Sequence, residues 1–217
     1  MPRWPRIPSS AFIAAIQAGY GSILNTLILA AGTAVKGKIG YRALCDGINF
    51  DVGLEYINIL LKAGADPNYS ILSNRDSGPF GSPLAPIQIA ASVKNLPALS
   101  LLIKYGADIN AFNLHFPVGV SNATALQFAA LHRNLQMADL LLENGADINA
   151  PPADRNGRTT LEGAAEHGRL EIVRFLLTRE PKLKISGPYR IHFLRAVKIA
   201  NERGHREVAE FLKLHGG

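Results

Sequence analysis

The chain has 217 residues, of which 47% are hydrophobic and 18% are charged, and its formal net charge is +6. This balance excludes an intrinsically disordered chain, which would combine few apolar residues with a high net charge. The length suffices for one or two domains with a sizeable apolar core. Because only 7% of the residues are aromatic, small aliphatic side chains must fill most of that core.

The charge is unevenly distributed along the chain. Residues 179–217 carry 9 Lys/Arg against 4 Asp/Glu, net +5, whereas residues 65–178 carry 8 against 10, net −2. A basic end can attract an acidic protein or a nucleic acid. It is also typical of a solvated surface, and this second interpretation is the one we favour.

The N-terminal region carries no targeting or membrane signal that we recognise. The first ten residues lack the apolar segment of a secretory signal. The segment FIAAIQAGYGSILNTLILAAGTAV (12–35) is interrupted by Gln17, Asn25 and two glycines, and we predict two buried helices there rather than a membrane span. Cys45 is the only cysteine, which excludes an intrachain disulfide and suits a reducing compartment. We expect an intracellular, cytoplasmic protein without membrane association.

A repeated pattern then runs through the chain. Apolar runs end at a Gly, or once at a Glu, and the positions in question are Gly32, Gly64, Gly106, Gly145, Glu180 and Gly216. Three of these lie in the near-identical segments KAGADPN, KYGADIN and ENGADIN. Spacings of 32 to 42 residues are the signature of a repeat protein. We predict one domain, 1–217, with the approximate periods 10–41, 42–74, 75–114, 115–154, 155–189 and 190–217, the first of them degenerate.

A second pattern precedes the apolar runs of the later periods. APIQIAASVKN starts at Ala85, TALQFAALHRN at Thr124, TTLEGAAEHGR at Thr159 and RAVKIANERGH at Arg195. It predicts a short first helix ending near the paired alanines, a tight turn, a second amphipathic helix, and a Gly that ends it. Helices this short are marginally stable alone, so successive periods must stack to bury their apolar faces.

Insertions rich in Gly, Pro, Asn and Ser separate the periods, and we predict that they are loops. Their sequences are YSILSNRDSGPFGSPL (69–84), AFNLHFPVGVSNA (111–123), APPADRNGR (150–158) and KISGPYRIHFL (184–194). Aromatic residues and arginines, which are common anchors of protein interfaces, are frequent in them.

These blocks resemble the ankyrin repeat, whose pattern joins T-P-L-H-x-A-A, G-H-L, a leucine run and G-A-D-x-N. The resemblance is strongest over 82–177, good over 54–81 and 192–217, and poor over 10–53; NAPPADRNGRT also resembles arrays common in fungal multi-repeat proteins. It implies an all-α ankyrin-repeat solenoid of helix–turn–helix periods with long inter-repeat fingers. The His of the pattern is replaced by Gln88, Gln127, Glu162 and Lys198, so its backbone hydrogen bonds must be replaced or lost.

Catalytic and metal-binding motifs are not evident. No two of the six His residues have the HExxH spacing, and a single Cys excludes a multi-cysteine zinc site. A metal shared by His132 and His167 is conceivable but not favoured. We interpret the recurring Asp of GAD as a structural Asx-type turn and His205 as structural. Glu162 and Glu166 lie one helical turn apart, but general acid–base catalysis would need a pocket with perturbed pKa values. We expect no enzymatic activity and no cofactor.

The resemblance implies that a protein partner binds the concave groove between fingers and first helices. By position and side-chain type, the candidate partner-binding residues are Tyr69, Leu84, Phe112, His115, Phe116, Leu131, His132, Arg155, Arg158, Glu166, His167, Tyr189, Arg190 and Arg203. The aromatic residues Phe112, Phe116 and Tyr189 could equally pin the fingers onto one another.

The sequence as a whole therefore predicts a monomeric, non-catalytic scaffold that binds another protein. Three alternatives stay open. The chain could be a regulatory segment excised from a larger multidomain protein, or a recruited small-molecule binder or unorthodox enzyme with a pocket between fingers and first helices. Binding of nucleic acid through the basic end is the third, and we do not expect it.

Overall fold

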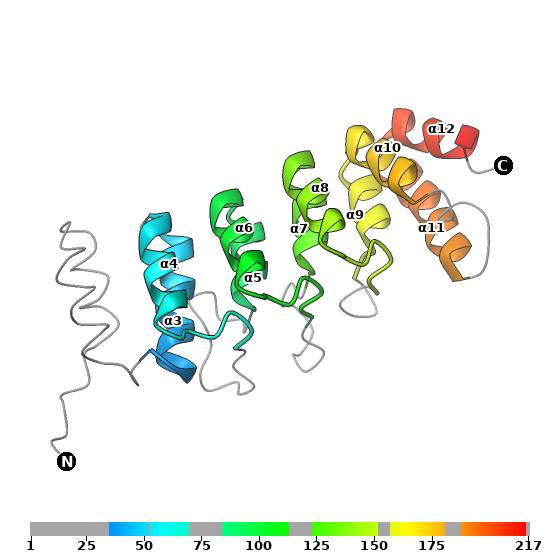
Figure 1. Ribbon diagram of the computed structural model, residues 1–217. Helices are drawn as coiled ribbons and strands as arrows, with labels where there is room; N and C mark the ends of the chain where they lie inside the picture. Colours follow the sequence, from blue (N-terminus) through cyan, green and yellow to red (C-terminus); the bar gives the residue numbers. More distant parts are fainter. Residues whose placement is uncertain are drawn as a thin grey trace, which may run out of the picture. The chain divides into compact units, whose positions relative to one another are not determined.

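The computed structural model describes residues 35–51, 53–69, 84–112, 123–151, 157–180 and 188–215. These residues form ten α-helices and no strand, which confirms the predicted all-α class for the described part of the chain. The chain divides into two compact units, which are Met1–Asp108 and Ile109–Gly217. The helices carry the labels α3 to α12 of Figure 1.

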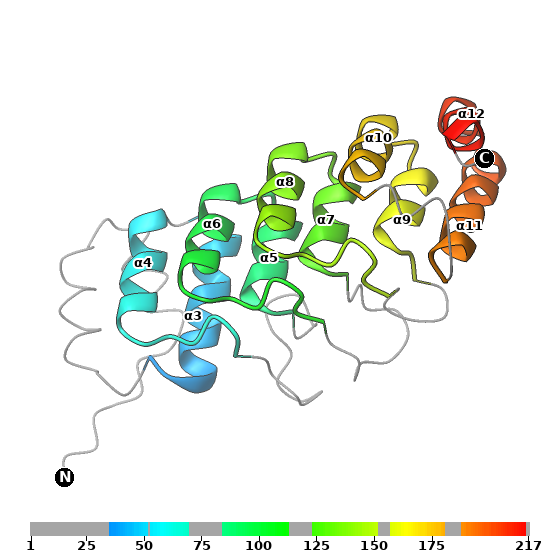
Figure 2. The ribbon, with the colours of Figure 1, turned by 45° about the vertical axis from the view of Figure 1, so that its right-hand side comes forward.

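The first unit holds two helical pairs. The earlier pair is α3 (Gly37–Asn49) with α4 (Leu54–Lys62), and the later pair is α5 (Pro86–Ser92) with α6 (Leu96–Lys104). α3 packs against α5 and α4 against α6, so the pairs stack first helix on first helix (Figures 1 and 2). Large side chains of all four helices, among them Leu44, Ile57, Ile87 and Leu99, are at most 1% exposed.

The second unit stacks three pairs in the same way. They are α7 (Ala125–Leu131) with α8 (Leu135–Glu143), α9 (Thr160–Glu166) with α10 (Leu170–Arg179), and α11 (Pro188–Glu202) with α12 (Arg206–His215). The first helices α7, α9 and α11 pack in sequence, and α10 contacts α12. Figure 2 shows the two helices of each pair side by side.

The paired alanines explain how closely the first helices approach. Ala164 and Ala165 of α9 are fully buried, as are Ala90 and Ala91 of α5. Because the alanine side chain is a single methyl group, neighbouring first helices can approach each other closely at these pairs. The second helix α10 buries the apolar face that the sequence predicted, with Ile172, Val173, Leu176 and Leu177 at most 4% exposed.

Polar side chains at the first helices replace the family histidine. In α7, Thr124 Oγ1 accepts from the amide of Gln127, and Gln127 Oε1 accepts from the amide of Thr124. In α9, Thr159 and Glu162 form the same reciprocal capping box, which fixes where each helix starts. Gln127 Nε2 also donates to the carbonyl oxygens of Ala150 and Pro151, tying α7 to the chain that follows α8.

The GADxN segments form side-chain turns that link successive periods. Asp66 accepts from the amide of Asn68, and Asp147 from the amide of Asn149, both at 2.8 Å, as the Asx-turn interpretation predicted. In the first unit the Asn68 side chain reaches the carbonyl of Gly106 and the amide of Asp108. In the second unit Asn110 bridges in the same way to Gly145 and Asp147.

One predicted loop is wrong in part. KISGPYRIHFL (184–194) was expected to lie between helices, but residues from Pro188 onward belong to α11. Pro188 is suited to the first position of a helix, because its φ is preset and no intrahelical partner exists there for an N–H. Arg195 and Lys198 then stand where α9 has its capping residues Thr159 and Glu162, so nothing local starts the helix at Arg195.

Other expectations concern period boundaries and undescribed segments. The predicted boundaries at 41/42 and 189/190 fall inside α3 and α11, and the single domain 1–217 stays a prediction. The two helices predicted within 12–35 lie outside the described residues, apart from Val35, as does most of the fingers at 69–84, 111–123 and 150–158.

Candidate functional site

Three charged residues predicted from sequence meet on the first-helix side of the second unit. Arg158 precedes α9, Glu166 is its last residue, and Arg203 lies in the turn after α11. Arg158 donates to both carboxylate oxygens of Glu166, with Nε–Oε2 at 2.8 Å and Nη2–Oε1 at 3.2 Å. Arg203 Nη2 donates to Oε1 at 2.7 Å. We call Arg158, Glu166 and Arg203 the arginine–glutamate cluster.

A glycine in α9 lies beside the start of the Arg158 side chain. Gly163 stands where α5 has Ile89 and α7 has Phe128. A Cβ built on Gly163 would lie 3.7 Å from the Cβ of Arg158, which is ordinary van der Waals contact. A bulky residue at 163 would compete with Arg158 for the same surface. The glycine that stands here in place of an apolar residue is therefore the sequence signal for the cluster.

The cluster is held by hydrogen bonds while parts of it face solvent. The side chains of Glu166, Arg158 and Arg203 are 15%, 28% and 60% exposed. Burial by itself would raise the pKa of Glu166, but hydrogen bonds and charge from Arg158 and Arg203 lower that pKa below its ordinary value. Glu166 is therefore an anion over an extended pH range, and the cluster carries a net charge of +1.

The backbone under the cluster is fixed by His205. Its Nε2 lies 3.0 Å from the carbonyl oxygen of Glu166, and its ring packs against Gly168, where an added Cβ would meet Nδ1 at 2.6 Å. Gly168 has a φ of +65°, which glycine adopts readily. His205 thus packs against the preceding pair and bonds its backbone, consistent with the structural role predicted for it.

The histidines considered for a shared metal, His132 and His167, are the C-cap residues of α7 and α9. His167, the C-cap of α9, is exposed, and its Nδ1 lies 3.0 Å from the carbonyl oxygen of Gly163. Leu131 and His132 are half-buried at the end of α7. No group of three or more His, Cys, Asp or Glu within the described ranges is arranged to hold a metal ion.

The candidates Leu84 and Tyr69 lie in the first unit and contact Tyr41 of that unit. Leu84 is 6% exposed, and its carbonyl oxygen accepts a 2.8 Å hydrogen bond from the hydroxyl of Tyr41. The ring of Tyr69 packs on Tyr41 with centroids 5.8 Å apart. Leu84 is thus a core residue, because the chain entering α5 turns its side chain inward.

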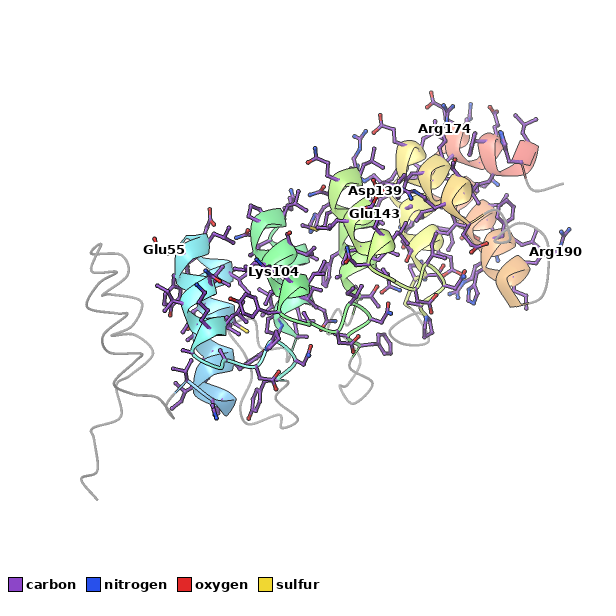
Figure 3. The ribbon with its side chains drawn as sticks, viewed as in Figure 1. Glu55, Lys104, Asp139, Glu143, Arg174 and Arg190 are labelled. Atoms are coloured by element: carbon purple, nitrogen blue, oxygen red, sulfur yellow. The ribbon has the colours of Figure 1, made fainter. Side chains whose placement is uncertain are left out.

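The remaining candidates divide into two groups. Phe112 is half-buried, and Arg190 is exposed in the first turn of α11 rather than in a finger. Figure 3 shows Arg190 projecting away from the neighbouring helices. His115, Phe116 and Arg155 lie outside the described residues, as does the side chain of Tyr189.

One buried charge cluster was not predicted from the sequence. Glu162 is fully buried, and beyond its capping bond its Oε1 lies 2.9 Å from Nδ1 of His192 and 3.8 Å from Nη1 of Arg195. Both partners come from α11, so the carboxylate joins two successive pairs. The nearby pair Glu162 and Glu166 was considered for acid–base chemistry, but each carboxylate contacts a separate set of side chains, His192 and Arg195 for Glu162 and Arg158 and Arg203 for Glu166.

Two further properties of the described residues concern reactivity and membranes. Cys45 is fully buried, and burial raises the pKa of its thiol above the ordinary value, which disfavours the reactive thiolate. None of the described helices combines the length and the apolar character that crossing a bilayer requires.

Helical pairs stacked through small residues, with asparagine-bridged turns between them, define a helical repeat protein. Residues 87–186 match the family model of ankyrin repeats, in three copies. Over these residues the chain is similar to ankyrin repeats, which confirms the resemblance found in the sequence. Ankyrin repeats generally mediate protein–protein interaction. A comparison with curated proteins gives no match.

Proposed function

We propose that this chain is a non-catalytic scaffold that binds another protein through the first-helix side of its second unit. The observation that carries the proposal is the arginine–glutamate cluster. Glu166 is 8 residues from Arg158 and 37 residues from Arg203 in sequence, and hydrogen bonds join it to both. The side chain of Arg203 remains 60% exposed, and its guanidinium has five N–H donors.

A held and partly exposed arginine suits binding for a physical reason. Ordering a long side chain on association costs conformational entropy, and Glu166 already restricts Arg158 and Arg203 in the free chain. Arginine also forms forked hydrogen bonds with carboxylates, and it is frequent among the residues that dominate interface energies. The partner contact therefore centres on the cluster, with His167 beside it.

The test compares two double variants of the intact chain. Arg158→Ala with Arg203→Ala removes the donors of the cluster, whereas Arg174→Ala with Thr178→Ala changes exposed residues on α10. Partners captured from native extract by the wild-type chain are purified and then titrated by calorimetry. Because hot-spot residues contribute about 2 kcal/mol or more, the cluster variant is expected to bind at least about 30-fold more weakly. Circular dichroism verifies that both variants keep their helices.

Two results would overturn the proposal. One is loss of binding by the α10 variant together with full binding by the cluster variant. The other is turnover of a small molecule by the purified chain that disappears when one His or Glu is changed, which would move the protein to the enzyme class.

A further inference from the structure

α11 is longer by about two helical turns than the first helices α5, α7 and α9. α5, α7 and α9 each have 7 residues, whereas α11 has 15. Aligned by their repeat pattern, Thr159 corresponds to Arg195, so residues 188–194 have no counterpart in α9. We call residues 188–194 the α11 extension, and Figure 2 shows α11 as longer than α9.

The inner side of the extension is packed against its own unit. Phe193 is 2% exposed, and Ala196, one turn further on, is fully buried. His192 contacts the buried carboxylate of Glu162 on α9 at 2.9 Å. The extension is therefore held by the second unit, and its outer side has a defined orientation.

The outer side of the same turns presents apolar side chains to solvent. Ile191 is 66% exposed and Leu194 is 54% exposed, and the two lie one turn apart on one helix face. Single exposed apolar residues are common on protein surfaces, but adjoining ones indicate interaction sites more often. The extension thus adds an apolar surface that the stack does not use.

A further ankyrin repeat is a poor occupant of this face. The second member of the alanine pair is buried in α5, α7 and α9, as Ala91, Ala130 and Ala165. The equivalent residue of α11 is the exposed Asn201, whose amide nitrogen donates to the carbonyl oxygen of Val197. This larger polar side chain opposes the close approach of another first helix, so the apolar pair suits a different occupant.

The charges around the apolar pair define that occupant. Arg190 is exposed and forms no ion pair within the described ranges, and the side chains of Arg195 and Lys198 are 39% and 74% exposed. The acidic residue of this face, Glu202, lies at the far end of α11 and pairs with Lys198. A partner surface that fits must combine apolar side chains with flanking carboxylates.

We propose that Arg190, Ile191, Leu194 and Lys198, which we call the α11 outer strip, form a docking site for an acidic amphipathic helix of a partner protein. From Ile191 to Lys198 the strip spans about 10 Å of straight helix surface. This length suits a helix that places apolar anchors one and two turns apart and Asp or Glu beside them. The strip is separate from the arginine–glutamate cluster, and it binds whether or not that cluster does.

The first experiment selects ligands for the intact chain from a displayed library of designed helical peptides. The expected winners carry apolar residues at i, i+3 or i+4 and i+7, flanked by Asp or Glu. Ile191→Ser with Leu194→Ser should weaken their binding at least 10-fold in fluorescence titration. Leu214→Ser is the matched control, because Leu214 is 81% exposed on α12 and lies outside the strip. The affinity of the Leu214→Ser variant for these peptides should stay within twofold of the wild-type value.

A charge reversal tests the choice of an acidic partner. Arg190→Glu places an acid in the first turn of a helix, where the helix dipole tolerates it, so folding is preserved. It should weaken binding of the selected peptides about 5- to 10-fold, whereas Lys213→Glu, an exposed change on α12, should not. Arg158→Ala with Arg203→Ala should leave peptide binding unchanged, which separates this site from the proposed function.

Several outcomes would overturn the proposal. Selection could yield no peptide, peptides without acidic bias, or peptides that bind the Ser variant as well as the wild type. Dimerisation that depends on Ile191 and Leu194, measured by sedimentation, would assign the strip to a second copy of the chain. Binding to phosphatidylserine vesicles in place of peptides, lost in the same variant, would assign it to a membrane surface.

Discussion

The α9–α10 and α11–α12 pairs share one repeat pattern, but their first helices begin in different ways. α9 begins at Thr160, directly behind the capping box of Thr159 and Glu162, and has 7 residues. α11 lacks that box, begins at Pro188 and has 15 residues. The start of each helix is thus set by local capping chemistry. Where the cap is missing, the helix extends back until a proline begins it.

The comparison also shows one residue acting on both pairs. Glu162 closes the capping box of its own helix and contacts His192 and Arg195 of the next one. The extended helix therefore depends on a carboxylate of the short helix. Substitutions at the matched positions of the two pairs separate these roles.

The largest effect is expected when the shared carboxylate is removed. Glu162→Ala should lower the free energy of unfolding by about 2–3 kcal/mol. A lost cap costs about 1 kcal/mol, and a broken fully buried ion pair about 3–5 kcal/mol. The latter is reduced here because His192 and Arg195 are 34% and 39% exposed. Guanidinium denaturation measures the change.

Glu162→Gln is the control for this prediction. Gln127 occupies the same position in α7 and keeps a capping box there. The Gln variant should therefore lose only about 1 kcal/mol, since the cap remains while the charge is lost. Equal losses in the Ala and Gln variants would show that the cap of α9 contributes nothing.

A smaller effect should distinguish the stacking surfaces of the two first helices. Ala165 is fully buried, and its counterpart Asn201 is exposed. Ala165→Leu should overpack α9 and cost about 1–3 kcal/mol. Asn201→Leu should change stability by less than about 0.5 kcal/mol. Thermal unfolding of the two variants measures the difference, and similar melting temperatures would contradict the close stacking of α9.

The pH dependence of the free energy of unfolding should reveal the contribution of Glu166, which links the α9–α10 and α11–α12 pairs. Its pKa is lowered in the folded chain, so ionised Glu166 stabilises the fold at pH values above its unfolded pKa of about 4.3. This contribution is lost as the pH falls through the folded pKa. Glu166→Gln should be less stable than the wild type at pH 7, by under about 1 kcal/mol because Arg203 is 60% exposed.

Denaturation of both proteins between pH 7 and pH 2.5 provides the measurement. The difference in the free energy of unfolding should shrink as Glu166 becomes protonated in the wild type. A difference that grows toward acid pH would mean that Glu166 is destabilising in its charged form.

The smallest effect concerns the turns inside the pairs. The α9–α10 turn uses Gly168 with a φ of +65°, whereas the α5–α6 turn places Lys94 at +63°. Lys94→Gly should stabilise the chain by about 0.5 kcal/mol, because relief of left-handed strain outweighs the added freedom of the unfolded chain. Gly168→Ala should destabilise it, since the new Cβ would lie 2.6 Å from Nδ1 of His205. Urea denaturation compares the two, and a destabilising Lys94→Gly would contradict the strain argument.

The sequence by itself determined the repeat and much of the local structure. Apolar periodicity, alanine pairs and terminal glycines specify the helical pairs because they act within a few residues of one another. The same holds for the Asp of GADxN, whose turn spans two residues. Arg158, Glu166 and Arg203 were also predicted as candidates, because the repeat pattern assigns each a position on the first-helix side.

Only the tertiary structure decided which side chains meet across repeats. Leu84 turns inward to the core, His192 and Arg195 reach the buried Glu162, and Arg158 reaches Glu166. Tertiary packing also holds the α11 extension on its unit, since Phe193 is 2% exposed. These contacts join residues that are distant in sequence, so they depend on how successive pairs stack, and short-range patterns carry no record of that geometry.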